Sequence, residues 1–246
     1  MTVVGEAPFM STPGPAATQL IALAAGALLV TSVLMVWRRE LSAQVRLLTV
    51  QGVSLAVLAV TIGLSGPASA RAELLVVAVL VLVLRAWLLP WVVGRRLRAG
   101  VEAGDAARED GARLNPTASL VVVALLATVA YLVSRPISEA VAAGSGAAVS
   151  GPAAFAVPVG VCMVLIGFLL LVGRRRAMSQ LIGFLVLDNG IATVAFLTAA
   201  GVPFAVELGV SSDVLLVVLI LAVLSRRIHA QVGSSTLDSM TELRDR

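Results

Sequence analysis

Four charged residues lie within stretches of the chain that are otherwise almost entirely apolar: Arg85, Asp188, Glu207 and Asp213. A charge inside a membrane-spanning helix costs about 2.5 to 3.5 kcal/mol on insertion scales, and such residues usually line ion paths or pair with one another. The helical rise of about 1.5 Å per residue places Arg85 roughly 13 Å, Asp188 roughly 16 Å and Asp213 roughly 18 Å from one membrane edge. These three charges are therefore predicted to share a layer near the middle of the membrane, whereas Glu207 lies nearer the opposite surface.

This charged layer has two interpretations. A buried arginine and a carboxylate can neutralise each other and fix helix packing, and removing one partner then destabilises the protein. Alternatively, a carboxylate poised between burial and a neighbouring cation can take up and release a proton, so that Asp188 and Asp213 form a lateral proton path. Arg85 keeps its proton at ordinary pH and would only set the electric field around a carboxylate. The sequence leaves both interpretations open.

Polar residues near these charges allow weaker predictions. We expect Gln51 and Ser54 to form ordinary interhelical hydrogen bonds, with a place in the charged layer as the alternative. Asn189 is a candidate water ligand beside Asp188. Gly190 would permit close approach of a neighbouring helix.

The composition indicates which elements hold these residues. Of 246 residues, 59% are hydrophobic and 13% are charged, and the mean hydropathy is +1.02. A soluble domain is nearer half apolar and a quarter charged, so the chain is predicted to be an integral membrane protein. Because the apolar segments are continuous rather than alternating, an all-α polytopic membrane helix bundle is favoured over a β-barrel.

About seven transmembrane helices of roughly 20 residues each are expected. Pro90 and Pro158 are expected to kink the helices that contain them. The predicted spans are residues 18–37, 45–64, 72–93, 118–134, 153–172, 177–199 and 204–224.

The arginines orient this bundle. All 18 basic residues are arginine, and the connections alternate between arginine-rich and arginine-poor. Arginine-rich connections face the cytoplasm, which predicts an outer N-terminus and an inner C-terminus. Trp37, Trp87 and Trp91 fall toward the cytoplasmic ends of their spans, as interfacial tryptophans do. The cytoplasmic set is Arg38, Arg39, Arg46, Arg95, Arg96, Arg98, Arg108, Arg113, Arg174, Arg175, Arg176, Arg226, Arg227, Arg244 and Arg246.

This topology divides the chain into five regions. Residues 1–17 form an extracytoplasmic tail and residues 226–246 a cytoplasmic tail. Between them, residues 18–134 form a four-helix membrane part, residues 135–152 an extracytoplasmic loop rich in small residues, and residues 153–225 a three-helix part.

Several classes of function are disfavoured. The chain has one cysteine, Cys162, and one histidine, His229, which are too few for an internal disulfide, a structural zinc, an iron–sulfur cluster or a nickel centre. No phosphate-binding loop or nucleophile triad is present. The arginines lack a basic fold or an aromatic stacking platform, so nucleic-acid binding is not expected. The chain is expected to be non-catalytic, with no cofactor of its own.

Segments of the C-terminal third resemble component E of hydrogenase-4 and formate hydrogenlyase complexes. The resemblance lies in residues 179–190 (SQLIGFLVLDNG), in residues 203–213 (PFAVELGVSSD) and in the ending STLD at 235–238 followed by Leu243. Residues 84–97 (LRAWLLPWVVGRRL) also look like the basic and proline-containing third helix of that family. The last three helices of the family are similar to subunit K of respiratory complex I and to the small C-type membrane protein of Mrp cation/proton antiporters.

The resemblance implies a role in a polar axis that links redox chemistry to ion translocation. By position, Asp188 and Asp213 match carboxylates of that axis in the relatives. The chain departs from the family pattern twice, with Asp188 where glutamate is usual and Arg85 where lysine is usual. Because arginine does not exchange its proton as a lysine can, the resemblance implies a field-setting role at Arg85.

The sequence is therefore interpreted as a non-catalytic membrane subunit of a group 4 hydrogenase-like, complex-I-related oxidoreductase in a bacterial or archaeal plasma membrane. Its implied partners are the lipid bilayer, antiporter-like subunits, a membrane anchor subunit and a peripheral redox module carrying iron–sulfur clusters and nickel–iron. A purely structural or assembly subunit that bridges antiporter-like proteins is the alternative. A stand-alone ion transporter is less favoured, because no inverted repeat and no substrate-sized polar cluster is found.

Overall fold

A computed structural model of the chain describes residues 14–65, 68–102, 115–142, 156–174 and 176–198. The described part contains helices and no strands, which confirms the predicted all-helical class. Its elements, in chain order, are α1 (Pro15–Trp37), α2 (Leu41–Ser65), α3 (Ala68–Val81), the π-helical segment η1 (Leu82–Leu88), α4 (Leu89–Glu102), α5 (Pro116–Ala142), α6 (Val157–Gly173) and α7 (Ala177–Thr198).

Five helical stretches in the described residues are long and apolar enough to cross a membrane: Pro15–Trp37, Leu41–Ser65, Leu75–Glu102, Thr117–Ala140 and Ala177–Thr198. The apolar helix α6 is shorter, at 17 residues. These six helices coincide with the first six predicted spans, and the pattern is that of a multi-pass membrane protein. The seventh predicted span, residues 204–224, lies outside the described residues.

Two helices extend beyond their predicted ends. The third continues through η1 and α4 to Glu102 rather than ending at residue 93, so the first part of the predicted connection is helical. The fourth passes through Pro136 and ends at Ala142, which makes the first part of the predicted loop 135–152 helical. The expected kink at Pro158 is wrong, because this residue lies in the first turn of α6, where a missing N–H breaks no helical hydrogen bond.

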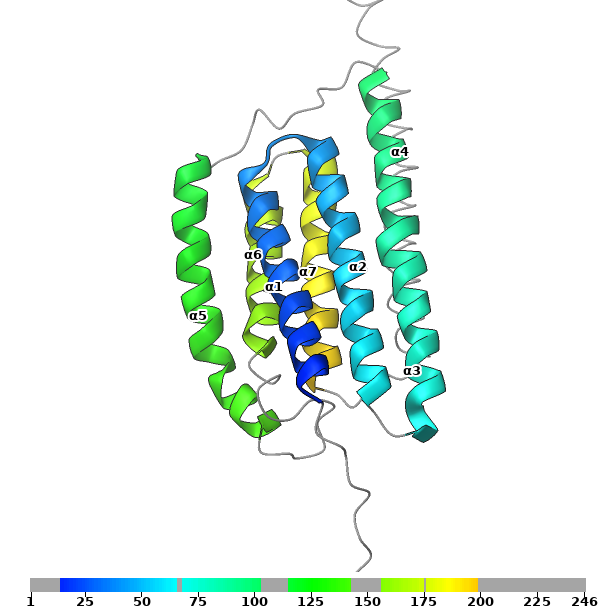
Figure 1. Ribbon diagram of the computed structural model, residues 1–246. Coiled ribbons are helices and arrows are strands. Elements are labelled where there is room, and N and C mark those ends of the chain that lie inside the picture. The colour runs from blue at the N-terminus through cyan, green and yellow to red at the C-terminus, as the bar shows by residue number, and fades with distance from the viewer. Residues whose placement is uncertain (1–13, 66–67, 103–114, 143–155, 175, 199–246) are drawn as a thin grey trace, which may run out of the picture.

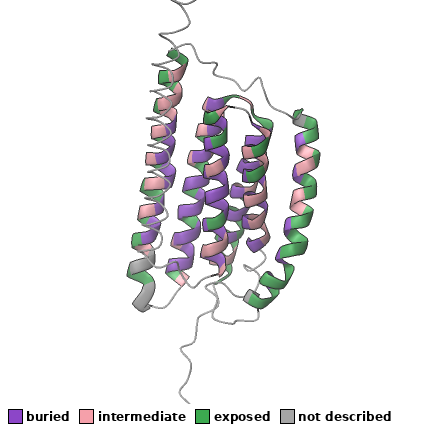
Figure 2. Cartoon of the chain, turned by 180° about the vertical axis from the view of Figure 1, so that it is seen from behind, coloured by how far each residue is buried: buried purple, intermediate pink, exposed green. Residues whose placement is uncertain are grey.

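With α3–η1–α4 taken as one continuous helix, consecutive helices run in opposite directions, and α1, α2, α6 and α7 lie in the centre (Figure 1). The continuous helix α3–η1–α4 lies at one edge of this group and α5 at the other. Buried residues concentrate on the central helices, whereas α5 presents mostly exposed residues (Figure 2). The central helices therefore provide the protected interior in which a polar group could be held.

Glycines allow the central helices α6 and α7 to pack very closely. Gly160 and Gly167 on α6 are seven residues apart, as are Gly183 and Gly190 on α7, so each pair lies on one helix face. A Cβ atom added at Gly167 would be 2.6 Å from the Cα of Leu187, and one added at Gly190 would be 2.7 Å from the backbone nitrogen of Val164. The expected close approach at Gly190 is thus confirmed.

The interior consists of two apolar clusters stacked along the bundle. One, toward the N-terminal end of α1, includes Leu28, Leu55, Val81 and Ala192. The other, toward the C-terminal end of α1, includes Met35, Leu48, Leu89 and Leu185. In α1, α2, α3–η1–α4 and α7, buried polar residues lie between the residues named for the first cluster and those named for the second. These polar residues are Ser32, Gln51, Arg85, Asp188 and Asn189. The fold therefore places one polar layer between two apolar ones.

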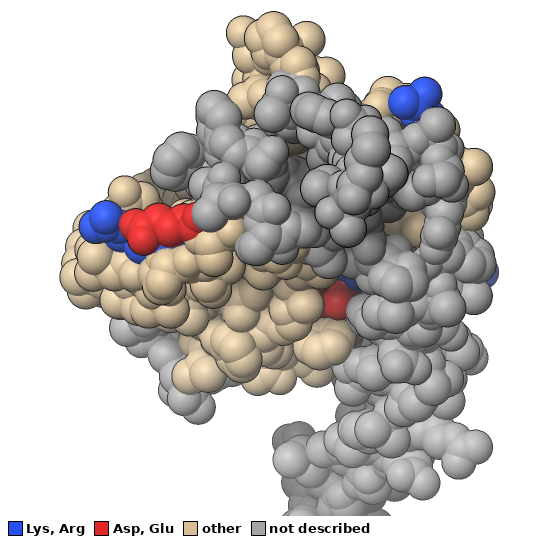
Figure 3. All heavy atoms as spheres, turned by 90° about the horizontal axis from the view of Figure 1, so that it is seen from below, with Lys and Arg blue, Asp and Glu red and all other residues tan. Residues whose placement is uncertain are grey.

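The described arginines gather at one end of the bundle. The α1–α2 connection, the C-terminal ends of α4 and α6 and the N-terminal ends of α5 and α7 lie at this end (Figure 1). The arginines in or beside them are Arg38, Arg39, Arg95, Arg96, Arg98, Arg174 and Arg176. Arg71 and Arg135 lie toward the opposite end, where the described surface is mostly uncharged (Figure 3). The arginine asymmetry used to orient the chain is thus present in the fold, and the orientation itself stays a prediction.

Tryptophans line the outer face of the edge helix near its arginine-rich end. The rings of Trp87 and Trp91 stack with centroids 6.5 Å apart, and the guanidinium of Arg95 lies 5.4 Å from the centroid of Trp91. Both tryptophans are exposed. Amphipathic rings next to a cation suit the boundary between lipid tails and headgroups.

Candidate functional site: a buried polar centre

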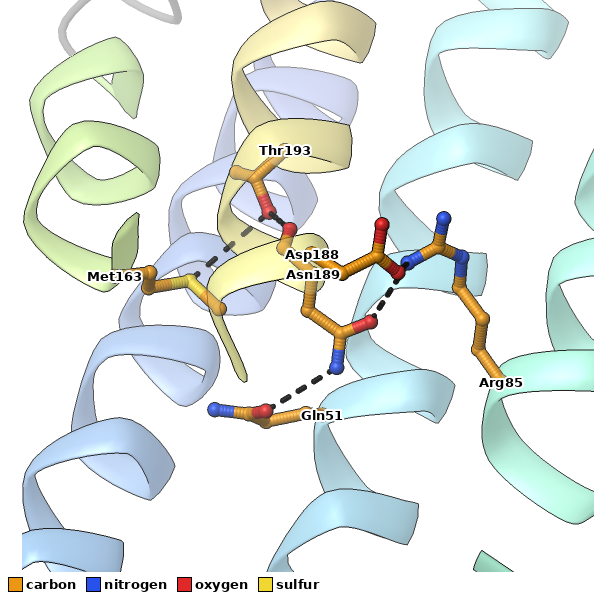
Figure 4. Close-up of polar contacts among 6 residues, drawn as sticks. All are labelled: Gln51, Arg85, Met163, Asp188, Asn189 and Thr193. Carbon is orange, nitrogen blue, oxygen red and sulfur yellow. Dashed lines mark hydrogen bonds and ion pairs between the residues drawn. The ribbon is translucent and has the colours of Figure 1, made fainter. Parts of the chain in front are cut away.

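Arg85 and Asp188 form an ion pair in the middle of the polar layer (Figure 4). The Nη1 atom of Arg85 donates to Oδ2 of Asp188. The two residues are 2% and 7% exposed, so the charges are almost fully shielded from solvent. The structure thus places two of the four charges identified in the sequence in one layer, as predicted, and also brings them into contact, which their depth alone did not decide. The other two, Glu207 and Asp213, lie outside the described residues.

A chain of hydrogen bonds connects this ion pair to α2 and α1. Nη1 of Arg85 also donates to Oδ1 of Asn189 at 3.0 Å, and Nδ2 of Asn189 donates to Oε1 of Gln51 at 3.2 Å (Figure 4). Nε2 of Gln51 donates to Oγ of Ser32 at 2.7 Å. Asn189 is thus held between the side chains of Arg85 and Gln51.

Gln51 and Ser54, the two polar residues for which interhelical hydrogen bonds were predicted, have different kinds of partner. Gln51 makes interhelical hydrogen bonds and also belongs to the charged layer, so both interpretations hold for it. The hydroxyl of Ser54 donates at 2.9 Å to the carbonyl of Val50 in its own helix, and the described residues give no interhelical bond for it. A serine hydroxyl satisfied in this way requires no partner on another helix.

The backbone around Arg85 is unusual. Residues Leu82–Leu88 form a π-helical turn, in which the N–H of Leu89 bonds to the carbonyl of Leu84. In a regular α-helix the ring of Pro90 would press against the carbonyl of Ala86, and a wider turn relieves that contact. Such segments are rare and occur often at functional sites. The helix thus accommodates Pro90 through a widened turn that carries Arg85.

Helix α2 approaches this turn so closely that only glycine fits at the contact. A Cβ atom added at Gly52 would be 2.5 Å from the backbone of both Arg85 and Ala86. Since Gly52 directly follows Gln51, the same close approach also brings Gln51 into the layer of the ion pair. The position of Arg85 relative to Asp188 therefore depends on the absence of a side chain at Gly52.

The chemistry available at this centre is the uptake and release of a proton, with the change of charge that accompanies it, at the carboxyl group of Asp188. Within the network described here, Asp188 is the only acid, and its neighbours are one permanent cation, two amides and a hydroxyl. Among the described residues, no group of three His, Cys, Asp or Glu side chains could hold a metal ion.

Sequence reasoning missed two residues with defined roles. Ser32 received no role, although the depth argument used for the charges also places it in the polar layer. Arg174 was used only as an orientation signal, yet it is 6% exposed. Its Nη2 lies 3.3, 3.2 and 3.2 Å from the carbonyl oxygens of Met35, Val36 and Arg38. Arg174 thus caps the C-terminal end of α1, where a cation is favoured.

Comparison with known proteins gives hydrogenase-4 components as distant relatives and a mycobacterial protein as a closer relative. No protein-family model and no solved structure matches the chain. Hydrogenase-4 component E of Escherichia coli K12 is 27% identical over 133 residues, which span 54% of this chain and 58% of component E. Component E of Shigella flexneri aligns equally well. The chain is therefore a distant homologue of a hydrogenase-4 component and spans little more than half of its length.

The closer relative matches almost throughout. Uncharacterized protein Rv0085 of Mycobacterium tuberculosis is 43% identical over 227 residues, which cover 92% of this chain and 96% of the relative. The shared region includes nearly the whole helical bundle, so the relationship is not limited to one apolar segment. The chain belongs to the same protein family as this mycobacterial protein.

Proposed function

We propose that the chain is a non-catalytic membrane subunit of a group 4 hydrogenase-like, complex-I-related oxidoreductase. In this proposal the polar centre belongs to the axis that couples redox chemistry in partner subunits to proton translocation. The partners are antiporter-like subunits, a membrane anchor subunit and a peripheral module that carries iron–sulfur clusters and nickel–iron. The site of action is the plasma membrane of a bacterium or archaeon.

The observation that carries this proposal is the Arg85–Asp188 ion pair between two apolar clusters. Apolar residues of similar volume usually stabilise a fold at least as well as a buried ion pair does, so stability alone is a weak reason for its presence. A carboxylate beside a fixed cation at mid-membrane suits charge transfer between subunits. The distant homology to a hydrogenase-4 component supports a redox complex as the setting.

A structural or assembly subunit is the second candidate. It is favoured by the bonds within the centre: Asp188 is paired with Arg85, and Asn189 is bonded at both ends of its amide. A polar centre bonded across several helices in this way can serve to fix helix register. Under this alternative the pair would neutralise itself and exchange no proton.

Mild-detergent affinity purification followed by mass spectrometry tests the setting. Co-purification of antiporter-like subunits with an iron–sulfur or nickel–iron module is expected. A chain that purifies alone, without such subunits, contradicts the proposal and would direct attention to a stand-alone transporter.

Asp188→Asn tests the coupling role in the purified complex. Asparagine keeps the size of the side chain but removes the carboxylate, so we expect assembly to persist while translocation per redox turnover falls. The matched control is Glu139→Gln, because Glu139 is an exposed carboxylate that pairs with Arg135 on α5. Equal translocation by Asp188→Asn and Glu139→Gln complexes would favour the structural alternative.

A further inference from the structure

The hydrogen bonds that lead away from Arg85 all run in one direction, and Arg85 itself dictates that direction. A guanidinium group has donors and no acceptor. The Asn189 atom that lies 3.0 Å from Nη1 of Arg85 must therefore be the amide oxygen, Oδ1. The ambiguity that usually affects amide orientation is thus removed at Asn189 by its charged neighbour.

Each following bond inherits this direction. Because the oxygen of Asn189 faces Arg85, its NH₂ group faces Gln51 and requires the amide oxygen there, 3.2 Å away. The NH₂ group of Gln51 must then donate to Oγ of Ser32, at 2.7 Å. The Ser32 hydroxyl is left to donate to the carbonyl of Leu28, at 2.8 Å. Every donor in the series points away from the ion pair and toward α1.

We propose that Asn189, Gln51 and Ser32 form a one-way hydrogen-bonded arm that positions the Arg85–Asp188 pair and carries no protons itself. The word "arm" denotes these three side chains hereafter. The proposal deepens the function proposed above and rests on it in so far as the ion pair is the working group of that function.

The positioning role follows from the bonds at Asn189. Its amide is bonded at both ends, and its backbone carbonyl accepts a hydrogen bond from Thr193 Oγ at 2.7 Å (Figure 4). Loss of the acceptor at Gln51 would leave a buried NH₂ group unsatisfied, and the amide would turn to find another partner. Arg85 would then lose its second acceptor beside Asp188. Successive bonds of the same polarity also strengthen one another in a medium of low dielectric constant.

The insulating role follows from the chemistry of the arm. Primary amides are not general acids or bases, so Asn189 and Gln51 cannot pass a proton along. The final hydroxyl, on Ser32, ends at the carbonyl of Leu28 inside α1. Protons exchanged at Asp188 must therefore enter and leave by a route that avoids the arm and α1.

Two serine variants provide a matched test of positioning. Ser32 and Ser54 are both buried, and both donate to a carbonyl of their own helix, but Ser32 alone of the two accepts a bond from Gln51. The full-length chain is unfolded reversibly in mixed micelles, and the unfolding equilibrium constant is measured for the unchanged chain, for Arg85→Met, for Asp188→Leu and for the double variant. This double-mutant cycle gives a coupling factor, which is the ratio by which the effect of one substitution on that constant changes when the other is present. The cycle is repeated in Ser32→Ala, Gln51→Met and Ser54→Ala backgrounds.

We expect the coupling factor to fall by about threefold or more with Gln51→Met, less with Ser32→Ala and not at all with Ser54→Ala, within the range known for contacting residues. A coupling factor unchanged by Gln51→Met, or equal effects of the two serine variants, would overturn the positioning role. If the Arg85 variants do not fold, hydrogen exchange of the Asn189 side-chain amide replaces the cycle. That exchange should accelerate about tenfold in Gln51→Met and stay unchanged in Ser54→Ala.

Translocation by the purified complex tests the insulating role. Ser32→Ala interrupts the arm at its last step, and its translocation per redox turnover is expected to fall less than that of Asp188→Asn and only in proportion to the loss of Arg85–Asp188 coupling. Equal loss in both variants, with the Arg85–Asp188 coupling retained in Ser32→Ala, would mean that protons pass through the arm. Because the coupling and exchange measurements use the chain without redox partners, their failure would leave the proposed function standing, and failure of co-purification would leave the arm standing.

Discussion

Replacing Gly52 by alanine tests how closely α2 must approach the turn that carries Arg85. The new Cβ atom would lie 2.5 Å from the Cα of Ala86 and from the carbonyl carbon of Arg85. Carbon atoms rest about 3.5 to 4.0 Å apart, so the two backbones must separate by roughly 1 Å. No rotamer change can relieve this contact, since the obstructing atoms belong to the main chain.

The magnitude follows from comparison with an unobstructed glycine. Gly26 on α1 has no atom within 4 Å of an added Cβ, so Gly26→Ala should gain about 0.5 to 1 kcal/mol of helix stability. Gly52→Ala makes the same gain but adds an overpacking cost of about 1 to 3 kcal/mol, with the upper end favoured by backbone contact. The two variants should therefore differ by about 3 kcal/mol in free energy of unfolding.

Reversible unfolding of the full-length variants in mixed micelles measures this difference. Because both changes convert glycine to alanine within a helix, the intrinsic terms cancel and the clash remains. Gly52→Ala should also weaken the Arg85–Asp188 coupling, since Arg85 shifts with its backbone. Equal unfolding free energies for Gly52→Ala and Gly26→Ala would refute the close approach of α2 to η1 and the dependence of the ion pair on it.

Three further changes have defined expectations in the same unfolding assay. Arg174→Gln removes a charged donor from the end of α1 and should lower the free energy of unfolding by about 1.5 to 3 kcal/mol. Gln44 also donates to the carbonyls of Met35 and Arg38. An unchanged free energy of unfolding would mean that Gln44 caps α1 by itself. Pro158→Ala should change stability by no more than about 1 kcal/mol, because proline suits the first turn of a helix. Pro136→Ala should stabilise α5, since this proline lies inside the helix and removes a backbone bond there. Destabilisation would show that the Pro136 ring has a packing role.

The helical class and the depth of the charges could be predicted because both depend on position along one axis. Continuous apolar stretches of about 20 residues specify helices in lipid, and six of the predicted spans coincide with described helices. A fixed rise per residue then gives the depth of each charge. Arg85 and Asp188 were assigned to the same layer in this way, and they are in contact.

Helix ends and proline effects were predicted less well, because they depend on competition between local and tertiary terms. Pro136 lies inside α5 although proline usually ends a helix. Pro90 is accommodated by a π-helical turn, and Pro158 lies at the start of α6. Sequence alone shows that a proline destabilises the interior of a helix, but it does not show whether the proline lies in the interior or in the first turn.

The sequence by itself determined that this protein is a helical membrane protein with charges at mid-membrane depth, because hydropathy and helical rise act along the helix axis. Only the tertiary structure decided which side chains face one another, because rotation about each axis is set by contacts between helices. Gly52 and Gly190 permit those contacts, and they bring Arg85, Asn189 and Gln51 into one bonded series. The direction of that series then follows from chemistry: a guanidinium can only donate, so every amide beyond it must align with it.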